Sequence, residues 1–234
     1  MTERFSRSAM LLGETSIEKL SKSHIIIFGA GGVGGYVFEA LARSGVGKID
    51  IVDSDVVNAS NINRQIIALE STLGIKKVEA AKKRALEINP DIKINAVDMF
   101  FMPDNAAEID FSKYDYVIDA IDTVTGKIAI IEGAKTAEKP IISCMGAGNK
   151  LNPMGFKVAD IAKTKICPLA RAMRKLLKDR GIRNVKVVYS EEEAMKPKII
   201  ENTGEKPVPG SVSFVPAAAG LLIASEVVKD LINS

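Results

Sequence analysis

The sequence predicts an α/β protein with a doubly wound, Rossmann-like, mostly parallel sheet and a C-terminal α/β extension. Two observations favour this class. Short apolar runs alternate with helix-like segments through the first 145 residues, and a glycine-rich turn, "GAGGVG", follows the first apolar run at residues 29–34. Strand–helix alternation at this spacing is typical of parallel sheets whose helices cover both faces.

The elements of the first part follow from this alternation. The predicted strands are 24–28, 48–53, 93–97, 116–119 and 141–145. The predicted helices are 34–44, 75–89 and 125–138. Thr125 is suited to cap the last of these helices, and the Asn89-Pro90 pair ends the middle one.

The character of the sequence changes after Gly148. The elements predicted there are a strand at 156–160, a very basic helix at 169–180, a strand at 185–189, a loop rich in Glu, Lys, Pro and Gly at 191–210, and a final helix at 216–232 that begins on a proline. We therefore expect a nucleotide-binding core with an N-terminal arm over 1–148. Residues 149–234 are expected to form a specificity region packed on that core.

Composition limits the classes of function. The 234 residues are 47% hydrophobic and 26% charged, as expected for a globular protein that buries a sizeable core. The net charge is only +3, so binding to nucleic acid would need a local cluster of cations. With two cysteines and no signal-peptide pattern we expect a cytoplasmic location. The uncharged stretch 207–225 has too few consecutive apolar residues to span a bilayer.

The glycine-rich turn is suited to bind phosphate. Gly29, Gly31 and Gly34 fit the fingerprint in which glycines permit a tight turn, close approach of phosphate and close helix packing. The N–H groups at the start of helix 34–44 would face the anion. Asp53, at the end of the second strand, is expected to bind ribose hydroxyls. Nicotinamide, flavin and ATP enzymes all fit this pattern.

Residues further along favour ATP. Arg64 and Lys77 are cations suited to neutralise a departing pyrophosphate, and Asp122 is a suitable Mg²⁺ ligand. An NAD-dependent oxidoreductase would leave all three without a role. One histidine, His24, and two cysteines cannot supply a four-ligand zinc site, so the chemistry must rely on carboxylates, cations and a nucleotide.

A set of motifs extends this reading over about residues 1–148. In chain order they are "GAGGVG", "VDSDVV", "SNINRQ", "GIKKVEA", "INP" and "VIDAIDT". With this order and spacing the chain resembles the ThiF/MoeB/ubiquitin-activating family of adenylating enzymes. The resemblance implies that the chain binds ATP and converts a carboxylate into an acyl-adenylate.

The resemblance also implies roles for single residues. The implied cofactor-binding residues are Gly29, Gly31, Gly32, Gly34, Asp53, Ser60, Asn61, Arg64, Lys77 and Asp122, with Asp122 also the Mg²⁺ ligand. The implied catalytic residues are Arg7, Arg64, Lys77 and Asp122. Arg7 matches an arginine that reaches the partner subunit's ATP site, which implies a homodimer. Asp55 is expected to be a turn residue and Asp119 to support its strand end.

Three further segments resemble one branch of the family, the tRNA threonylcarbamoyladenosine dehydratases. They are "RFSRSAMLLG" (4–13), "NRQIIAL" (63–69) and "ADIAKT" followed by "PLA" (159–170). The implied reaction adenylates the threonine carboxylate of the modified adenosine next to the anticodon, after which it cyclises. The alternative is an adenylyltransferase that activates the C-terminus of a ubiquitin-like sulfur carrier, although the two Cys-x-x-Cys zinc pairs of such enzymes are absent here. A non-catalytic tRNA-binding protein is a third reading.

Partners follow from the same branch. Residues 163–186 contain nine cations against one acid, Asp179, and such a strip would bind a phosphate backbone in a salt-dependent way. We therefore expect tRNA to dock there. A sulfur or redox relay protein is a further candidate partner. Cys167 is not expected to be catalytic, and Cys144 is expected to be a core residue.

Overall fold

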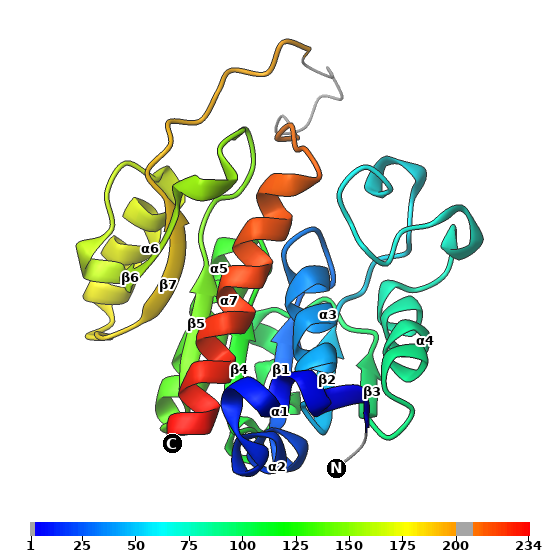
Figure 1. The fold of residues 1–234 in the computed structure, drawn as a ribbon. Helices are drawn as coiled ribbons and strands as arrows, with labels where there is room; N and C mark the ends of the chain where they lie inside the picture. Colours follow the sequence, from blue (N-terminus) through cyan, green and yellow to red (C-terminus); the bar gives the residue numbers. More distant parts are fainter. Residues whose placement is uncertain (1–2, 200–207) are drawn as a thin grey trace.

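The computed structural model describes residues 3–199 and 208–234, and within them the strands form a single seven-stranded sheet (Figure 1). The strands are β1 (His24–Phe28), β2 (Lys48–Val52), β3 (Lys93–Val97), β4 (Tyr116–Asp119), β5 (Ile141–Cys144), β6 (Phe156–Asp160) and β7 (Lys186–Ser190). The α-helices are α1 (Ser6–Leu12), α2 (Glu14–Lys22), α3 (Gly34–Ser44), α4 (Lys77–Ile88), α5 (Val124–Thr136), α6 (Pro168–Asp179) and α7 (Phe214–Asn233). The predicted fold class is confirmed.

The order of the strands predicts a crevice at the carboxyl ends of the central strands β1 and β4. Their order is β3-β2-β1-β4-β5-β7-β6, and every neighbouring pair is parallel except β6 with β7. The chain therefore leaves β1 toward β2 on one side and returns to β4 on the other. Loops diverge at such a switch point, which is where open α/β sheets bind ligands.

The sheet separates two apolar cores. Helices α2, α3, α4 and α7 share one core with residues such as Ile25 and Ile27 of β1. Helices α5 and α6 share the other core with Ile26 and Phe28 of the same strand. Alternate residues of a strand point to opposite faces, so a strand buried on both faces appears in the sequence as a continuous apolar run.

The N-terminal helices are the main part of the fold that the sequence did not predict. Helix α1 buries no residue and leaves Met10 80% and Leu11 85% exposed. Its apolar residues do not form the stripe of a packed helix, so the sequence pattern did not indicate one. Most other boundaries agree to within two residues. Helix α7 begins at Phe214 rather than at Pro216, because a proline in the first turn lacks only an N–H that needs no helical partner.

The C-terminal extension continues the sheet of the first part. Strand β7 pairs with β5, and β6 forms the outer edge. Helix α7 crosses α3 so closely that a β-carbon on Gly220 would lie 2.5 Å from the Val33 carbonyl oxygen. The division at residue 148 remains a prediction. Residues 200–207 of the predicted loop lie outside the described residues, and no helix among those described is long and apolar enough to cross a membrane.

The turn between β1 and α3 depends on a close approach of backbone. A β-carbon on Gly34 would lie 1.8 Å from the carbonyl oxygen of Gly29. Gly29 itself has a φ of 96°, in the region that favours glycine, and its own β-carbon would lie 2.8 Å from the carbonyl oxygen of Ala120. The two glycines therefore allow α3 to begin directly against the end of β1.

We expect Gly34→Ala to lower the free energy of unfolding by about 1–3 kcal/mol, as overpacking typically does. Gly31→Ala is the matched control: its β-carbon would have only the Gln65 side-chain nitrogen nearby, at 4.0 Å, and Gly31 has no positive φ. Urea denaturation of both variants without ligand measures the difference. Equal losses of stability would contradict the role given to the Gly29–Gly34 contact.

Candidate active site

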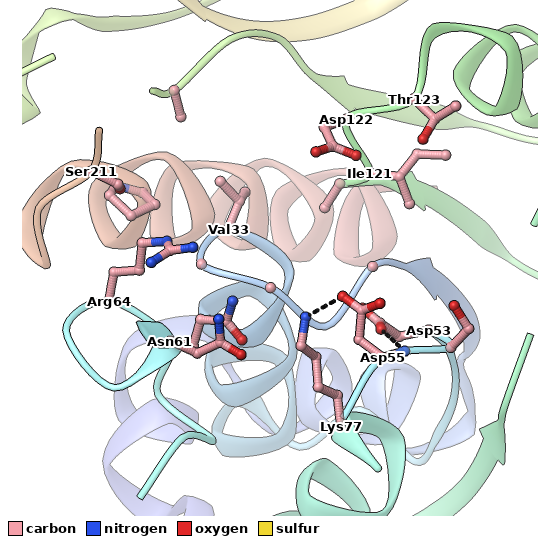
Figure 2. Close-up of a pocket in the computed structure, with 18 of the residues that line it drawn as sticks. Val33, Asp53, Asp55, Asn61, Arg64, Lys77, Ile121, Asp122, Thr123 and Ser211 are labelled. Carbon is pink, nitrogen blue, oxygen red and sulfur yellow. Dashed lines mark hydrogen bonds and ion pairs between the residues drawn. The ribbon is translucent and has the colours of Figure 1, made fainter. Parts of the chain in front are cut away.

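A pocket of about 390 Å³ opens at the carboxyl ends of the strands (Figure 2). The loops after β1, β2 and β4 line it, together with residues of the C-terminal extension. The residues that sequence analysis assigned to this site and that line the pocket are Gly29, Gly31, Gly32, Asp53, Asn61, Arg64, Lys77 and Asp122. The pocket therefore lies at the switch point between β1 and β4 and gathers most of the predicted set.

The glycines of the turn have different roles. Gly29, Gly31 and Gly32 line the pocket, whereas Gly34 does not and serves the packing of α3 instead. At Gly32 a β-carbon would lie 3.2 Å from the side chain of Pro216. The start of α7 therefore packs against the turn at Gly32, and Gly29, Gly31 and Gly32 border the pocket.

Asp53 fastens the glycine-rich turn from the neighbouring strand. Its Oδ2 accepts a hydrogen bond of 2.7 Å from the Ala30 N–H, and its Oδ1 accepts one of 2.9 Å from the Asp55 N–H. The carboxylate is half-buried at the end of β2. Each oxygen keeps a lone pair for a further donor, so a role toward ribose hydroxyls is compatible with this geometry.

Lys77 is the most deeply placed cation of the pocket. It is the first residue of α4, only 5% exposed, and its Nζ donates a hydrogen bond of 2.7 Å to Asp55 Oδ2. The prediction that Asp55 is only a turn residue was incomplete. Its carboxylate, 64% exposed, neutralises a buried ammonium that would otherwise lose hydration without compensation.

Arg64 lies on the other side of the glycine-rich turn in Figure 2. Its Nη1 donates to the Ser60 carbonyl at 2.8 Å and to Asn63 Oδ1 at 2.9 Å. These two acceptors fix one terminal nitrogen of the guanidinium, and the side chain lines the pocket. Ser60 is exposed and does not line the pocket, so its predicted phosphate contact remains a prediction.

Asp122 is the acidic group on the opposite rim. It follows β4, is exposed, and its carboxylate makes no hydrogen bond or ion pair with the described residues. Those residues contain no cluster of three or more His, Cys, Asp or Glu side chains that could hold a metal ion. One free carboxylate facing a phosphate site nevertheless fits Mg²⁺, which proteins typically bind through one or two carboxylates plus phosphate oxygens and water.

Arg7 is the predicted residue that the structure does not bring to the pocket. It is exposed on α1, at the amino ends of the strands (Figure 1). The nearby Phe5 ring packs beside Gly45, which follows α3: a β-carbon on Gly45 would lie 3.6 Å from it. Within one chain, therefore, Arg7 lies at the opposite end of the sheet from the pocket.

Several pocket residues escaped the sequence analysis. Gln65 lines the pocket and is 6% exposed, and its Oε1 is buried without a hydrogen-bond partner among the described residues. Its place in the quoted "SNINRQ" motif was the available signal. Phe100 and Phe101, which follow β3, and Pro209 and Ser211, which precede α7, carried no such signal.

Both thiols are buried away from solvent. Cys144 is 4% and Cys167 3% exposed, and burial raises the pKa of the Cys144 thiol to about 12. The expectation that Cys144 is a core residue is confirmed. A thiol of that pKa is protonated at neutral pH and is a poor nucleophile.

A glycine-rich turn at the switch point of an open α/β sheet, with Arg64 and Lys77 lining the adjoining pocket, is typical of nucleotide-binding proteins. The chain belongs to the ThiF family, whose model matches residues 5–234. It is 39% identical to the tRNA threonylcarbamoyladenosine dehydratase of Bacillus subtilis over 100% of the chain and 96% of that protein. It is 35% identical to the enzyme of the same name from Escherichia coli over 98% and 93%.

Solved structures agree with the assignment of the chain to the ThiF family. The crystal structure of the Escherichia coli tRNA N6-threonylcarbamoyladenosine dehydratase in complex with ATP matches with a TM-score of 0.90 and 36% identity, covering 99% of this chain and 94% of that one. A second structure of that enzyme holds AMP and matches with the same TM-score. The resemblance drawn from the sequence motifs is thereby confirmed along the whole chain.

We expect neither thiol to react with iodoacetamide in the folded protein at pH 8, because both are buried and Cys144 stays protonated far above that pH. Both should react in denaturant. Intact-mass spectrometry over a time course measures the difference. Rapid alkylation of Cys167 in the folded protein would instead favour a thiol role and a sulfur-relay partner.

Proposed function

We propose that the chain is an ATP-dependent tRNA threonylcarbamoyladenosine dehydratase. The observation that carries this proposal is the joint presence of full-length likeness to enzymes of that name and a pocket that gathers Asp53, Arg64, Lys77 and Asp122. A cytoplasmic location is part of the proposal, since tRNA is the substrate.

The first half of the reaction is an adenylation. The threonine carboxylate of the modified adenosine attacks the α-phosphorus of ATP, and the α–β bond breaks to release pyrophosphate. In this proposal Arg64 and Lys77, which line the pocket, neutralise the charge of the departing pyrophosphate, and Gln65 and the backbone of the glycine-rich turn orient the triphosphate. On binding, a phosphate oxygen takes the place of the Asp55 carboxylate beside Lys77.

Asp122 is the residue that would hold Mg²⁺ together with phosphate oxygens. When bound, the ion adds positive charge beside the α- and β-phosphates as the bond between them breaks. Asp122 has no partner among the described residues that must first be displaced, so it is available for this role.

The second half needs no protein nucleophile. The neighbouring carbamoyl group loses a proton, attacks the acyl carbon and expels AMP, so that the ring closes with net loss of water. Both groups belong to one substrate, and such proximity replaces a covalent enzyme intermediate. This agrees with two buried thiols and a single histidine, whose Nε2 lies 2.8 Å from Asp50 at the far end of the sheet.

One assay separates the proposal from its alternative. AMP and pyrophosphate release is measured with ATP and, in turn, tRNA bearing threonylcarbamoyladenosine, the same tRNA without the modification, and a ubiquitin-like sulfur-carrier protein. The proposal predicts turnover with the modified tRNA alone. Turnover only with the sulfur carrier would establish the adenylyltransferase instead. Tighter binding of NAD than of ATP with Mg²⁺, measured by calorimetry, would contradict both the dehydratase and the adenylyltransferase.

We expect Asp122→Asn and Lys77→Ala to lower the rate of adenylation by about two to three orders of magnitude, while the Kd for ATP changes only about fivefold, because their charges act mainly on the transition state. Lys76→Ala is the matched control: its Nζ donates to Ser54 O and Asp98, and it does not line the pocket. Single-turnover rates and calorimetry supply the two quantities. Equal losses in the adenylation rate and in the affinity for ATP would mean that these residues only help to bind ATP.

The structure divides the predicted basic strip into two sets of cations. Lys186 pairs with Asp230, Arg180 with Glu132, and Arg174 donates to the Thr164 carbonyl and hydroxyl, so these three already have partners within the protein. The remaining six are exposed and make no side-chain bond with the described residues: Lys163, Lys165, Arg171, Lys175, Lys178 and Arg183. These six supply the tRNA-docking surface of the proposal.

We expect Arg171→Ala/Lys175→Ala to weaken tRNA binding and to reduce the slope of log K against log salt by about one to two units, because fewer counterions are released. Lys83→Ala/Lys93→Ala, which removes two exposed lysines from α4 and β3, is the matched control and should leave the slope unchanged. Binding titrations at several salt concentrations give both slopes. Identical slopes for the two variants would move the docking surface elsewhere.

A homodimer completes the proposal. Arg7 lies at the far end of its own sheet, so it can reach a nucleotide only in the pocket of a partner subunit. Exposed Met10 and Leu11 on the same helix provide apolar surface for such an interface. An arginine delivered in this way would neutralise phosphate charge as the α–β bond breaks.

We expect Arg7→Ala and Asp122→Asn chains to be inactive alone and to regain activity when mixed. Random exchange makes about half the dimers mixed, each with one site that holds wild-type Arg7 and Asp122, so about a quarter of wild-type activity should return. Pyrophosphate release after verified subunit exchange tests this. No recovery, or a monomer in sedimentation under assay conditions, would remove Arg7 from the mechanism.

A further inference from the structure

Lys127 is a completely buried charge beside the proposed active site. It lies one turn into α5 and is 0% exposed, which is rare for lysine unless the ammonium is paired. Its Nζ lies 3.0 Å from Asp119 Oδ1 and 2.9 Å from Asp119 Oδ2, and it donates to the Ile121 carbonyl at 2.9 Å. The ammonium therefore directs its donors at the end of β4 and the loop that follows.

Asp119 joins three elements through its carboxylate. It too is 0% exposed, and beside Lys127 it accepts from the Ser143 hydroxyl on β5 and from the Ile121 N–H at 3.3 Å. Its two oxygens thus bind the start of α5, strand β5 and the loop after β4. The expectation that Asp119 supports its strand end is borne out, and the contact extends further than expected.

These contacts enclose the loop that carries Asp122. The residue before Asp122 is held at both its N–H and its carbonyl, by Asp119 and Lys127 respectively. The residue after it, Thr123, accepts a hydrogen bond of 2.9 Å from the Lys127 N–H. Asp122 itself is exposed on the pocket rim in Figure 2, so its position depends on its fixed neighbours.

Stability alone does not account for this ion pair. A buried salt bridge gains little over well-packed apolar side chains of similar volume, because both charges lose their hydration. An apolar side chain could fill the same space but could not hold the Ile121 carbonyl. We propose that Lys127, through Asp119 and Ile121, is a positioning residue that aims Asp122 into the pocket. This inference rests on the role of Asp122 in the proposed function.

Three variants separate positioning from stability. Lys127→Met leaves the Asp119 carboxylate buried without its cation and is expected to be destabilised. Asp119→Asn/Lys127→Met removes both charges and keeps an oxygen for Ser143, so it should fold. Lys127→Arg keeps the charge and several donors. Lys135→Met is the matched control, since Lys135 lies on the same helix but donates to the distant Asn184 carbonyl.

The readouts are hydrogen exchange of peptides spanning 119–128, the thermal midpoint, the Kd for ATP, and kcat for pyrophosphate release. For the pair variant we expect about tenfold or faster exchange in these peptides and unchanged exchange in β1 and α3. We expect its Kd for ATP to stay within about threefold and its kcat to fall about ten- to a hundredfold, the loss that small misplacement of a catalytic group produces. Lys127→Arg should recover most of both effects, and Lys135→Met should match the wild type.

Unchanged exchange at 119–128 in a folded pair variant would overturn the inference, as would a kcat within threefold of the wild type. Proportional loss of ATP affinity and kcat would also overturn it, since that pattern describes damage to the whole pocket. The exchange measurement does not depend on the substrate. If the wild-type chain proves inactive on modified tRNA, the proposed function fails while the positioning of the 120–123 loop is still decided.

Discussion

The carbonyl oxygen of Gly29 occupies the place where any other residue at position 34 would put its β-carbon, 1.8 Å away. This contact sets the distance between the end of β1 and the start of α3. Because the turn between them is so tight, Gly29, Gly31 and Gly32 can line the pocket without side chains of their own. The Ala120 carbonyl packs on the same turn, so the loops after β1 and β4 must keep a fixed separation.

Three charged side chains of the pocket, those of Asp53, Lys77 and Arg64, are held by other groups of the protein. Asp53 is anchored by two backbone N–H groups, and Lys77 by Asp55. Arg64 is braced by the Ser60 carbonyl. A site arranged in this way loses little entropy when an anion arrives, because its side chains are already ordered.

The sequence predicted the central elements well because most strands there are apolar runs buried in the sheet, and such runs need no tertiary information to be recognised. It failed at α1, whose Met10 and Leu11 face solvent and form no helical stripe with buried neighbours. Local motifs located the pocket, but pairings across the chain, such as Lys77 with Asp55 or Arg174 with Thr164, are set by tertiary packing. For the same reason the sequence could not predict which cations of the basic strip 163–186 have bonding partners within the protein.

The last helix of the chain has a bearing on how the protein is made. Helix α7 packs against α3 on the face of β1, and its Pro216 borders Gly32 in the pocket. Domains generally fold as units during synthesis, once the residues of each domain have been made. Here the pocket is complete only after α7 (Phe214–Asn233) has been synthesised, long after the glycine-rich turn that its Pro216 borders. Nascent chains that still lack α7 would therefore have an incomplete pocket, although the turn and the strands around it had already been made.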